Sequence, residues 1–235
     1  MGLADITVHV VDLDALAPDS VGTDTYAAAS AAASTLDAAE RERAGRLRSP
    51  VDRRRYIEAH RVLRRLLGDA VGVAPGDVRI LRAACLACGG PHGKPQADGV
   101  EFSLSRSGAF AAIALGPVPC GVDIEERGAQ EPAALAPLRD GVLAPGESGD
   151  DLLATWVRKE ALLKATGEGL TRPMAEVSVA EAVRAGILRD LDLPVALAGR
   201  LVGAVAVTAP ASWFTGAPPA TGKVRALSSR PEGAS

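Results

Sequence analysis

The strongest periodic pattern in the chain lies between Val51 and Leu67, where apolar side chains recur every three or four positions. Tyr56, Ala59, Leu63 and Leu67 fall on one face of a helix, and polar residues occupy the remaining positions. Two glycines follow the last apolar residues and provide a stop signal. The pattern therefore predicts a long amphipathic helix that packs its apolar face on a core.

Shorter apolar stretches elsewhere predict the remaining elements. One further helix is expected over residues 34–48, with Ser34 or Thr35 as its cap, and Pro50 ends it. Another is expected to begin at Asp150 or Asp151 and to run to about residue 166. Residues 133–139 are expected to form a short helix or a loop. Strands are predicted over residues 6–11, 78–82, 100–104, 109–115, 120–125, 177–179, 187–191 and 195–207, with residues 105–108 as a turn.

Gly116, Pro117 and Pro119 interrupt these elements near the middle of the chain, where we place a junction. Strand, helix and strands follow one another before this break and again after it, although no sequence repeat is visible. We therefore expect one region over residues 1–118 and a second over residues 119–210. Proline, serine and glycine are frequent from residue 211 onward, so we expect a poorly ordered tail over residues 211–235.

Composition and charge limit the class of protein. The chain has 235 residues and is 47% apolar but only 3% aromatic, so alanine, valine and leucine must fill its core. The formal net charge of −3 argues against general nucleic-acid binding. Its apolar runs are too short for a membrane span or a secretory signal, so we expect no membrane association. Three cysteines do not form a disulfide framework, and we expect a cytoplasmic protein.

Three carboxylates and a lysine form the most informative chemical pattern. Asp123 and Glu125 alternate with apolar residues, so on a strand both side chains point to the same face. Glu160 and Lys164 lie four positions apart and share one face of a helix. Carboxylates beside an ammonium group are typical of a site where a divalent cation holds a phosphate. The alternatives are a solvated edge strand and an ordinary surface ion pair.

These segments resemble a known family. Gly-Val-Asp-Ile-Glu at residues 121–125, followed by Trp-x-x-Lys-Glu-Ala-x-x-Lys at residues 156–164, resembles the signature pair of the 4′-phosphopantetheinyl transferase superfamily. Gly-Lys-Pro at residues 93–95 and Phe-Ser-Leu-Ser-Arg-Ser at residues 102–107 are similar to the upstream motif of that family. The arginine-rich helix over residues 53–65 is similar to the corresponding helix of actinobacterial-type members. The resemblance covers roughly residues 40–207, and the length of the chain points to the two-lobed Sfp-type branch.

The resemblance implies an α+β fold of two pseudo-symmetric lobes, each a small antiparallel sheet packed on a long helix. It implies a holo-acyl-carrier-protein synthase, a transferase that moves the phosphopantetheine arm of coenzyme A to a serine of an apo acyl or peptidyl carrier protein. The other product is 3′,5′-ADP, and the carrier would belong to secondary-metabolite or fatty-acid synthesis. Members of this branch are expected to act as monomers.

The resemblance also assigns the catalytic and metal-binding residues. Asp123, Glu125 and Glu160 are expected to hold Mg²⁺, and Mn²⁺ would suit the same oxygen ligands. Glu160, directly or through a metal-bound water, is the candidate that takes the proton of the carrier serine. Lys164 is expected to neutralise the departing phosphate or to protonate it. Trp156 is expected to be a packing anchor.

Coenzyme A binding is expected to come mainly from the first region. The residues assigned to it are Lys94, Ser105, Arg106, Arg53, Arg54 and Lys164. Arg106 stands where the family usually has histidine, and arginine keeps a cation that can bind phosphate. Most of the ten arginines between residues 41 and 65 are expected to be solvated.

Other interpretations remain open. A coenzyme A-binding protein without transfer activity would have the same fold, and a magnesium-dependent phosphohydrolase would explain the carboxylates alone. Cys85, Cys88 and His92 have the spacing of zinc ligands, but only three ligands are near one another, so two free thiols in a loop are favoured. His60 is expected to be packed, and Cys120 to be a buried apolar residue.

Overall fold

The computed structural model describes residues 2–16, 35–128, 136–208 and 224–227. Predictions for Ser34, for residues 133–135 and for most of the tail fall outside these ranges. Among the described residues, no helix is both long and apolar enough to cross a membrane.

The first sheet has four strands in the order β4-β5-β1-β9. Its strands are β1 (Thr7–Asp12), β4 (Glu101–Ser107), β5 (Phe110–Gly116) and β9 (Val224–Leu227). The first three are antiparallel, and β9 lies parallel to β1. Strand β9 falls within the predicted tail, and its backbone pairs with β1 on the side opposite β5.

One long helix covers the outer face of this sheet, and a shorter helix packs against it. The longer one, α3 (Pro50–Val71), begins at the cap Ser49, and Pro50 occupies its first turn, where a missing N–H does no harm. It ends at Gly72, whose left-handed backbone suits glycine. Helix α2 (Ala38–Arg46) begins later than predicted, because Asp37 and Glu40 cap each other's backbone N–H groups.

The second sheet has three antiparallel strands in the order β6-β8-β7, and α6 (Leu152–Thr166) lies on it. Its strands are β6 (Cys120–Glu126), β7 (Leu188–Asp190) and β8 (Leu201–Val207). The N-cap of α6 is Asp151, one of the two predicted caps, whose side chain accepts a hydrogen bond from the Ala154 N–H.

Two of the predicted strands of this lobe are wrong. Ser178 caps a helix, α7 (Val179–Arg184), so the predicted strand at 177–179 does not form. The predicted strand at 195–207 begins instead with the short helix α8 (Val195–Ala198), which follows Pro194. In both places a helix-starting residue precedes the apolar side chains, and strand β8 begins only at Leu201.

Smaller elements connect the two sheets and their helices. A two-stranded hairpin, β2 (Ile80–Arg82) and β3 (Pro95–Ala97), leads into β4. The helix α5 (Arg139–Val142) precedes α6. Short 3-10 helices occupy Leu3–Asp5, Pro75–Asp77, Ala136–Leu138, Gly169–Thr171 and Met174–Glu176.

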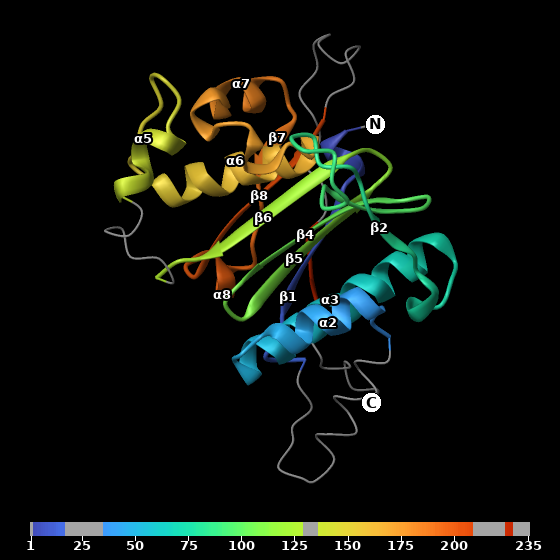
Figure 1. Cartoon of the computed structure of the whole chain (residues 1–235). Coiled ribbons are helices and arrows are strands. Elements are labelled where there is room, and N and C mark those ends of the chain that lie inside the picture. The colour runs from blue at the N-terminus through green and yellow to red at the C-terminus, as the bar shows by residue number, and fades with distance from the viewer. Residues whose placement is uncertain (1, 17–34, 129–135, 209–223, 228–235) are drawn as a thin grey trace.

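The molecule has four layers in the order helix, sheet, sheet, helix, with α3 and α6 on the two outer faces (Figure 1). Apolar residues of β1 and β5 on one side, and of β6 and β8 on the other, form the core between the sheets. The opposite faces of the sheets pack on α3 and α6, respectively. The architecture confirms the predicted α+β fold, in which small, largely antiparallel sheets pack on long helices.

Candidate functional site

The close approach of β6 to α6 positions the predicted chemical residues. A Cβ atom at Gly121 would lie 2.0 Å from the Ala161 carbonyl oxygen and 2.4 Å from the Ala165 nitrogen. Only glycine allows the strand to lie this close to the helix. Two residues farther along β6, Asp123 therefore faces Lys164.

Asp123 is the centre of a buried polar cluster. Its Oδ1 accepts hydrogen bonds from Ser105 Oγ and from Lys164 Nζ, each at 2.6 Å. The Asp123 side chain is almost completely buried, and Oδ2 has no protein hydrogen-bond partner. One oxygen of this carboxylate is thus held in place, whereas the other is buried without a hydrogen-bond partner.

Glu125 and Glu160 complete the carboxylate set. Ser107 Oγ donates to Glu125 Oε2 at 2.6 Å. Burial raises the pKa of Glu125, and the negative charge of Asp123 raises it further. Burial also raises the pKa of Glu160; Lys164 opposes this shift, and the two other carboxylates reinforce it. Three interacting carboxylates thus face a single ammonium group, so part of their charge is uncompensated.

The three carboxylates are ligands of the kind that a hard divalent cation prefers, although they do not converge on one point. All their ligand atoms are carboxylate oxygens, which Mg²⁺ prefers, and the free Asp123 Oδ2 and the raised pKa values indicate a place for positive charge. The three carboxylates do not bring their ligand atoms within 4.8 Å of one another. In the described part of the chain, Cys85, Cys88 and His92 do so. The metal-binding role of the carboxylates stays a prediction.

Three serines of β4 join the two sheets. Ser105 and Ser107 were expected in a turn, but β4 extends to Ser107 and the turn occupies residues 108–109. The alternating serines all face β6, and each hydroxyl oxygen accepts a backbone N–H of that strand. The pairs are Ser103 with Val122, Ser105 with Ile124 and Ser107 with Glu126. The strand edge of one lobe thereby fixes the position of the carboxylates in the other.

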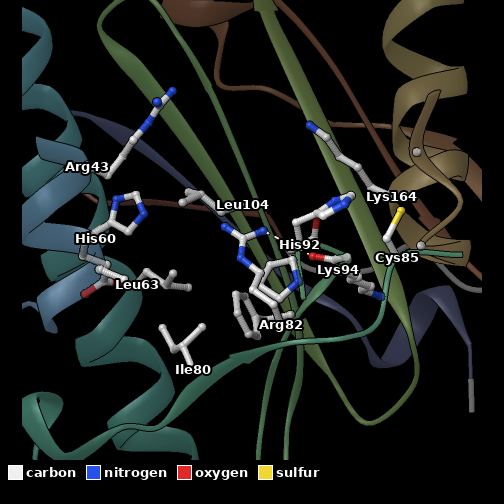
Figure 2. Close-up of a pocket in the computed structure, with 18 of the residues that line it drawn as sticks. Arg43, His60, Leu63, Ile80, Arg82, Cys85, His92, Lys94, Leu104 and Lys164 are labelled. Carbon is white, nitrogen blue, oxygen red and sulfur yellow. Dashed lines mark hydrogen bonds between the residues drawn. The ribbon is translucent and has the colours of Figure 1, made fainter. Parts of the chain in front are cut away.

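A cavity of about 770 Å³ lies between the two lobes. Four cations line it, namely Arg43, Arg82, Lys94 and Lys164. In the view of Figure 2, Arg43 and Lys164 extend toward each other from the two helical sides. The remaining wall is largely apolar and includes Leu63, Ile80, Phe102, Leu104 and Leu163, and three carboxylates, Asp37, Glu40 and Glu168, also line it. A cavity of this size and lining accommodates a small molecule that carries anionic groups.

Lys94 and Lys164 both line the cavity, as the prediction of coenzyme A binding requires. Lys94 Nζ also donates to the carbonyl oxygens of Cys120 and Ala165, at 3.0 and 3.2 Å, and so connects its hairpin to the second lobe. Ser105 lies deeper, against Asp123, and is not among the lining residues of the cavity.

The predicted arginines lie elsewhere. Arg53 donates to the Leu47 carbonyl oxygen and Arg54 to Asp14, and both lie outside the lining of the cavity. The Arg106 guanidinium lies 5.1 Å from the centre of the Tyr56 ring. Because Tyr56 lines the cavity, Arg106 lies near the cavity wall.

Two cationic groups were missed by sequence reasoning. Arg43 belongs to the arginine-rich stretch, where nine other arginines hid it, and α2 turns it into the cavity. Arg82 lies at the end of β2, and no local pattern marked it. Both are solvent-exposed, without the burial that would hold a structural arginine.

His60 and Trp156 have packing roles. The His60 ring stacks on Tyr56 with 3.9 Å between ring centroids, and its Nδ1 lies 2.9 Å from the Tyr56 carbonyl oxygen. Burial lowers the pKa of His60 to about 4, so this ring is neutral at neutral pH. Trp156 packs against the core between α6 and the second sheet, as expected of an anchor.

Comparison with known proteins points to one family. Residues 119–200 match the family model of the 4′-phosphopantetheinyl transferase superfamily, and this span includes β6 and α6. The chain is also similar to the 4′-phosphopantetheinyl transferase HetI of Nostoc sp., with 32% identity over 164 residues. The match covers 63% of this chain and 66% of that relative, just under two thirds of its length.

Proposed function

The chain belongs to the 4′-phosphopantetheinyl transferase superfamily, and from this premise we propose that it transfers the phosphopantetheine arm of coenzyme A to a serine of an apo carrier protein. The observation that carries the proposal is the position of Lys164. Its side chain lines the cavity and also donates to Asp123, so the ligand cavity and the carboxylates form one continuous site.

The cavity suits the 3′,5′-ADP end of coenzyme A. Its apolar wall would contact the adenine base, and the guanidinium groups of Arg43 and Arg82 would bind the 3′-phosphate. Lys94 and Lys164 lie on the side nearer α6, where the pyrophosphate would follow. We thus replace Arg53 and Arg54 with Arg43 and Arg82 in the proposed binding set.

Asp123, Glu125 and Glu160 would hold the divalent cation, with Mg²⁺ as the proposed ion and Mn²⁺ as a substitute. When bound, this cation would offset the charge of the pyrophosphate and of the attacking oxygen. Ser105 and Ser107 would keep Asp123 and Glu125 oriented through the hydrogen bonds they donate.

Glu160 is the proposed general base. Its raised pKa indicates a carboxylate that accepts a proton more readily than an exposed glutamate does. The serine oxygen of the carrier attacks the β-phosphorus of coenzyme A, the bond from that phosphorus to the bridging oxygen breaks, and 3′,5′-ADP departs. Lys164, one helical turn from Glu160, would neutralise the charge on the leaving phosphate.

Intact-mass measurement tests this proposal. The full chain is incubated with an apo acyl or peptidyl carrier protein, coenzyme A and Mg²⁺, and the carrier should gain the mass of one phosphopantetheine arm. Removal of Mg²⁺ by a chelator should stop the reaction, and added Mg²⁺ or Mn²⁺ should restore it. Glu160→Gln should slow transfer by about 10²–10⁴-fold, the usual contribution of a general base.

Glu181→Gln is the matched control, because Glu181 is an exposed acid on α7 of the same lobe. Its rate should equal that of the unmodified chain. Coenzyme A binding without mass gain on any carrier would indicate a non-catalytic binding protein instead. Cleavage of coenzyme A in the absence of carrier would indicate a phosphohydrolase.

A further inference from the structure

The tip of the β2–β3 hairpin carries two cysteines and a histidine that the proposed transfer does not use. The hairpin strands are only three residues each, and Leu81 and Leu86 are more than half exposed, so this hairpin has little core of its own. Isolated two-stranded hairpins are at best marginally stable in water. An additional constraint at the tip would stabilise it.

The side chains at this tip already have the arrangement of metal ligands. One ligand atom each of Cys85, Cys88 and His92 lies within 4.8 Å of the other two, and Cys88 Sγ is 3.0 Å from His92 Nε2. Thiol and imidazole groups are otherwise rare here, since the sequence contains three cysteines and three histidines.

The backbone of the loop supports this arrangement. Gly89 has a φ of +72°, and its N–H donates to the Cys85 carbonyl oxygen at 2.8 Å, which closes the turn between the two cysteines. At Gly90, a Cβ atom would lie 3.0 Å from the His92 ring and 3.4 Å from Cys88 Sγ. Glycine at both positions lets the two sulfur atoms and the imidazole converge.

We propose that Cys85, Cys88 and His92 bind one thiophilic divalent cation of the zinc class. Two thiolates and one neutral imidazole are ligands that zinc prefers in tetrahedral sites. Binding replaces the protons of the two thiols, which are released to solvent, and the two thiolate charges balance the charge of the cation. Cys85 and His92 line the cavity, so the fourth coordination position would be open to water from that side.

The cation would hold the residues that follow it in position. Gly93 comes directly after His92, and a Cβ atom there would lie 2.7 Å from the Ala83 carbonyl oxygen, so the two arms of the hairpin touch. The Ala83 N–H donates to the Lys94 carbonyl oxygen at 3.0 Å. A cation at the tip would therefore fix the hairpin that carries Lys94 into the cavity. This inference stands whether or not the chain transfers phosphopantetheine.

Metal analysis of the purified full chain tests the site. The chain is prepared under reducing conditions, and elemental analysis should find about one zinc per molecule. Replacement of zinc by Co²⁺ should give intense thiolate-to-cobalt absorption. Cys88→Ser and His92→Ala should each weaken Co²⁺ binding by more than the roughly 10–100-fold loss typical of outer-shell substitutions. Cys120→Ala is the matched control and should leave the spectrum unchanged, since Cys120 is buried in the core between the sheets.

Three results would overturn the proposal. The first is a chain that, with its thiols reduced, binds neither zinc nor Co²⁺. The second is cobalt absorption that persists in Cys88→Ser. The third is a disulfide between Cys85 and Cys88 in the chain isolated under reducing conditions, seen as the loss of both free thiols. Circular dichroism of each variant separates loss of the metal from loss of the fold.

Discussion

The long helices of the two lobes share one structural device and differ in what they present to the cavity. On α3, the fully buried Arg64 donates to Glu40 and Asp37, each at 2.6 Å, and to the Val78 carbonyl oxygen at 2.9 Å. On α6, the fully buried Lys159 pairs with Glu147 at 2.5 Å. Its Nζ also donates to the carbonyl oxygens of Val142 and Met174. In both lobes a buried cation connects neighbouring segments of the chain to the long helix.

The faces toward the cavity are different. Helix α3 contributes Tyr56, His60 and Leu63, which form an aromatic and apolar wall, whereas α6 contributes Lys164 to the lining and carries Glu160 near the carboxylates. In the proposed function, the first lobe would therefore hold the adenine ring, and the second would carry the groups that act on the phosphate.

The largest effect is expected from removing either buried cation. Arg64→Leu and Lys159→Leu should each lower the free energy of unfolding by about 3–5 kcal/mol, because a buried carboxylate partner remains without its counter-charge. Urea denaturation of the full chain measures this loss. Arg54→Leu is the control for α3, since Arg54 is 45% and its partner Asp14 40% exposed, so their ion pair should contribute less than about 1 kcal/mol.

One outcome would break the comparison between the two helices. If Lys159→Leu unfolded at the same urea concentration as the unmodified chain and yet failed to transfer phosphopantetheine, Lys159 would belong to the chemistry. Arg64 would then be the only one of the pair with a structural role.

Sequence patterns predicted the regular part of the site well and its remainder poorly. Period two placed Asp123 and Glu125 on one face of β6, and period four placed Glu160 and Lys164 on one face of α6. Both spacings follow from local backbone geometry, so they can be recognised in the sequence. The contact between Ser105 and Asp123 joins two sheets, and no local rule describes it.

The same limit applies to the cations. Lys159 and Lys164 are equally conspicuous in the sequence, but only the fold shows that one is buried against Glu147 and the other lines the cavity. Arg43 could not be separated from its neighbours for the same reason. Which arginine of an arginine-rich stretch lines the cavity depends on tertiary packing.

A smaller effect on stability is expected from two carboxylates of the second lobe, Glu147 and Glu160, whose contributions have opposite signs. Burial tends to raise the pKa of Glu147, but the hydrogen bond from Lys159 and those from two backbone N–H groups outweigh it, so the net shift is downward. The pKa of Glu160 is raised by burial and by its acidic neighbours. The folded state therefore favours the charged form of Glu147 and the neutral form of Glu160.

The direction of each pKa shift determines how the stability of the fold changes with pH. Stability that comes from Glu160 is present below its ordinary pKa of 4.5 and disappears as the pH rises through its higher folded value. Stability from Glu147 is present above 4.5 and disappears as the pH falls through its lower folded value. At neutral pH, Glu160→Gln should raise the free energy of unfolding by about 0.5–2 kcal/mol although it slows transfer. Glu147→Gln should lower the free energy of unfolding.

Thermal unfolding from pH 4 to 8 measures both effects. The difference between Glu160→Gln and the unmodified chain should grow as the pH rises. A Glu160→Gln variant that is less stable than the unmodified chain at neutral pH would show that Glu160 has a favourable partner and does not face uncompensated charge.

The smallest change in the free energy of unfolding is expected where β4 contacts β6. Two serines of β4 can be compared there. Ser103 accepts only the Val122 N–H, at 3.0 Å, whereas Ser107 accepts the Glu126 N–H and also donates to Glu125. Each Ser→Ala substitution should lower the free energy of unfolding by about 0.5–1.5 kcal/mol, the net value of a hydrogen bond. Only Ser107→Ala should raise the pKa of Glu125, because that hydrogen bond favours the charged form. NMR titration of the Glu125 carboxyl tests this difference. Equal titration curves in the two variants would mean that β4 joins the sheets without tuning the carboxylates, so that the first lobe would act on the chemistry through ligand binding alone.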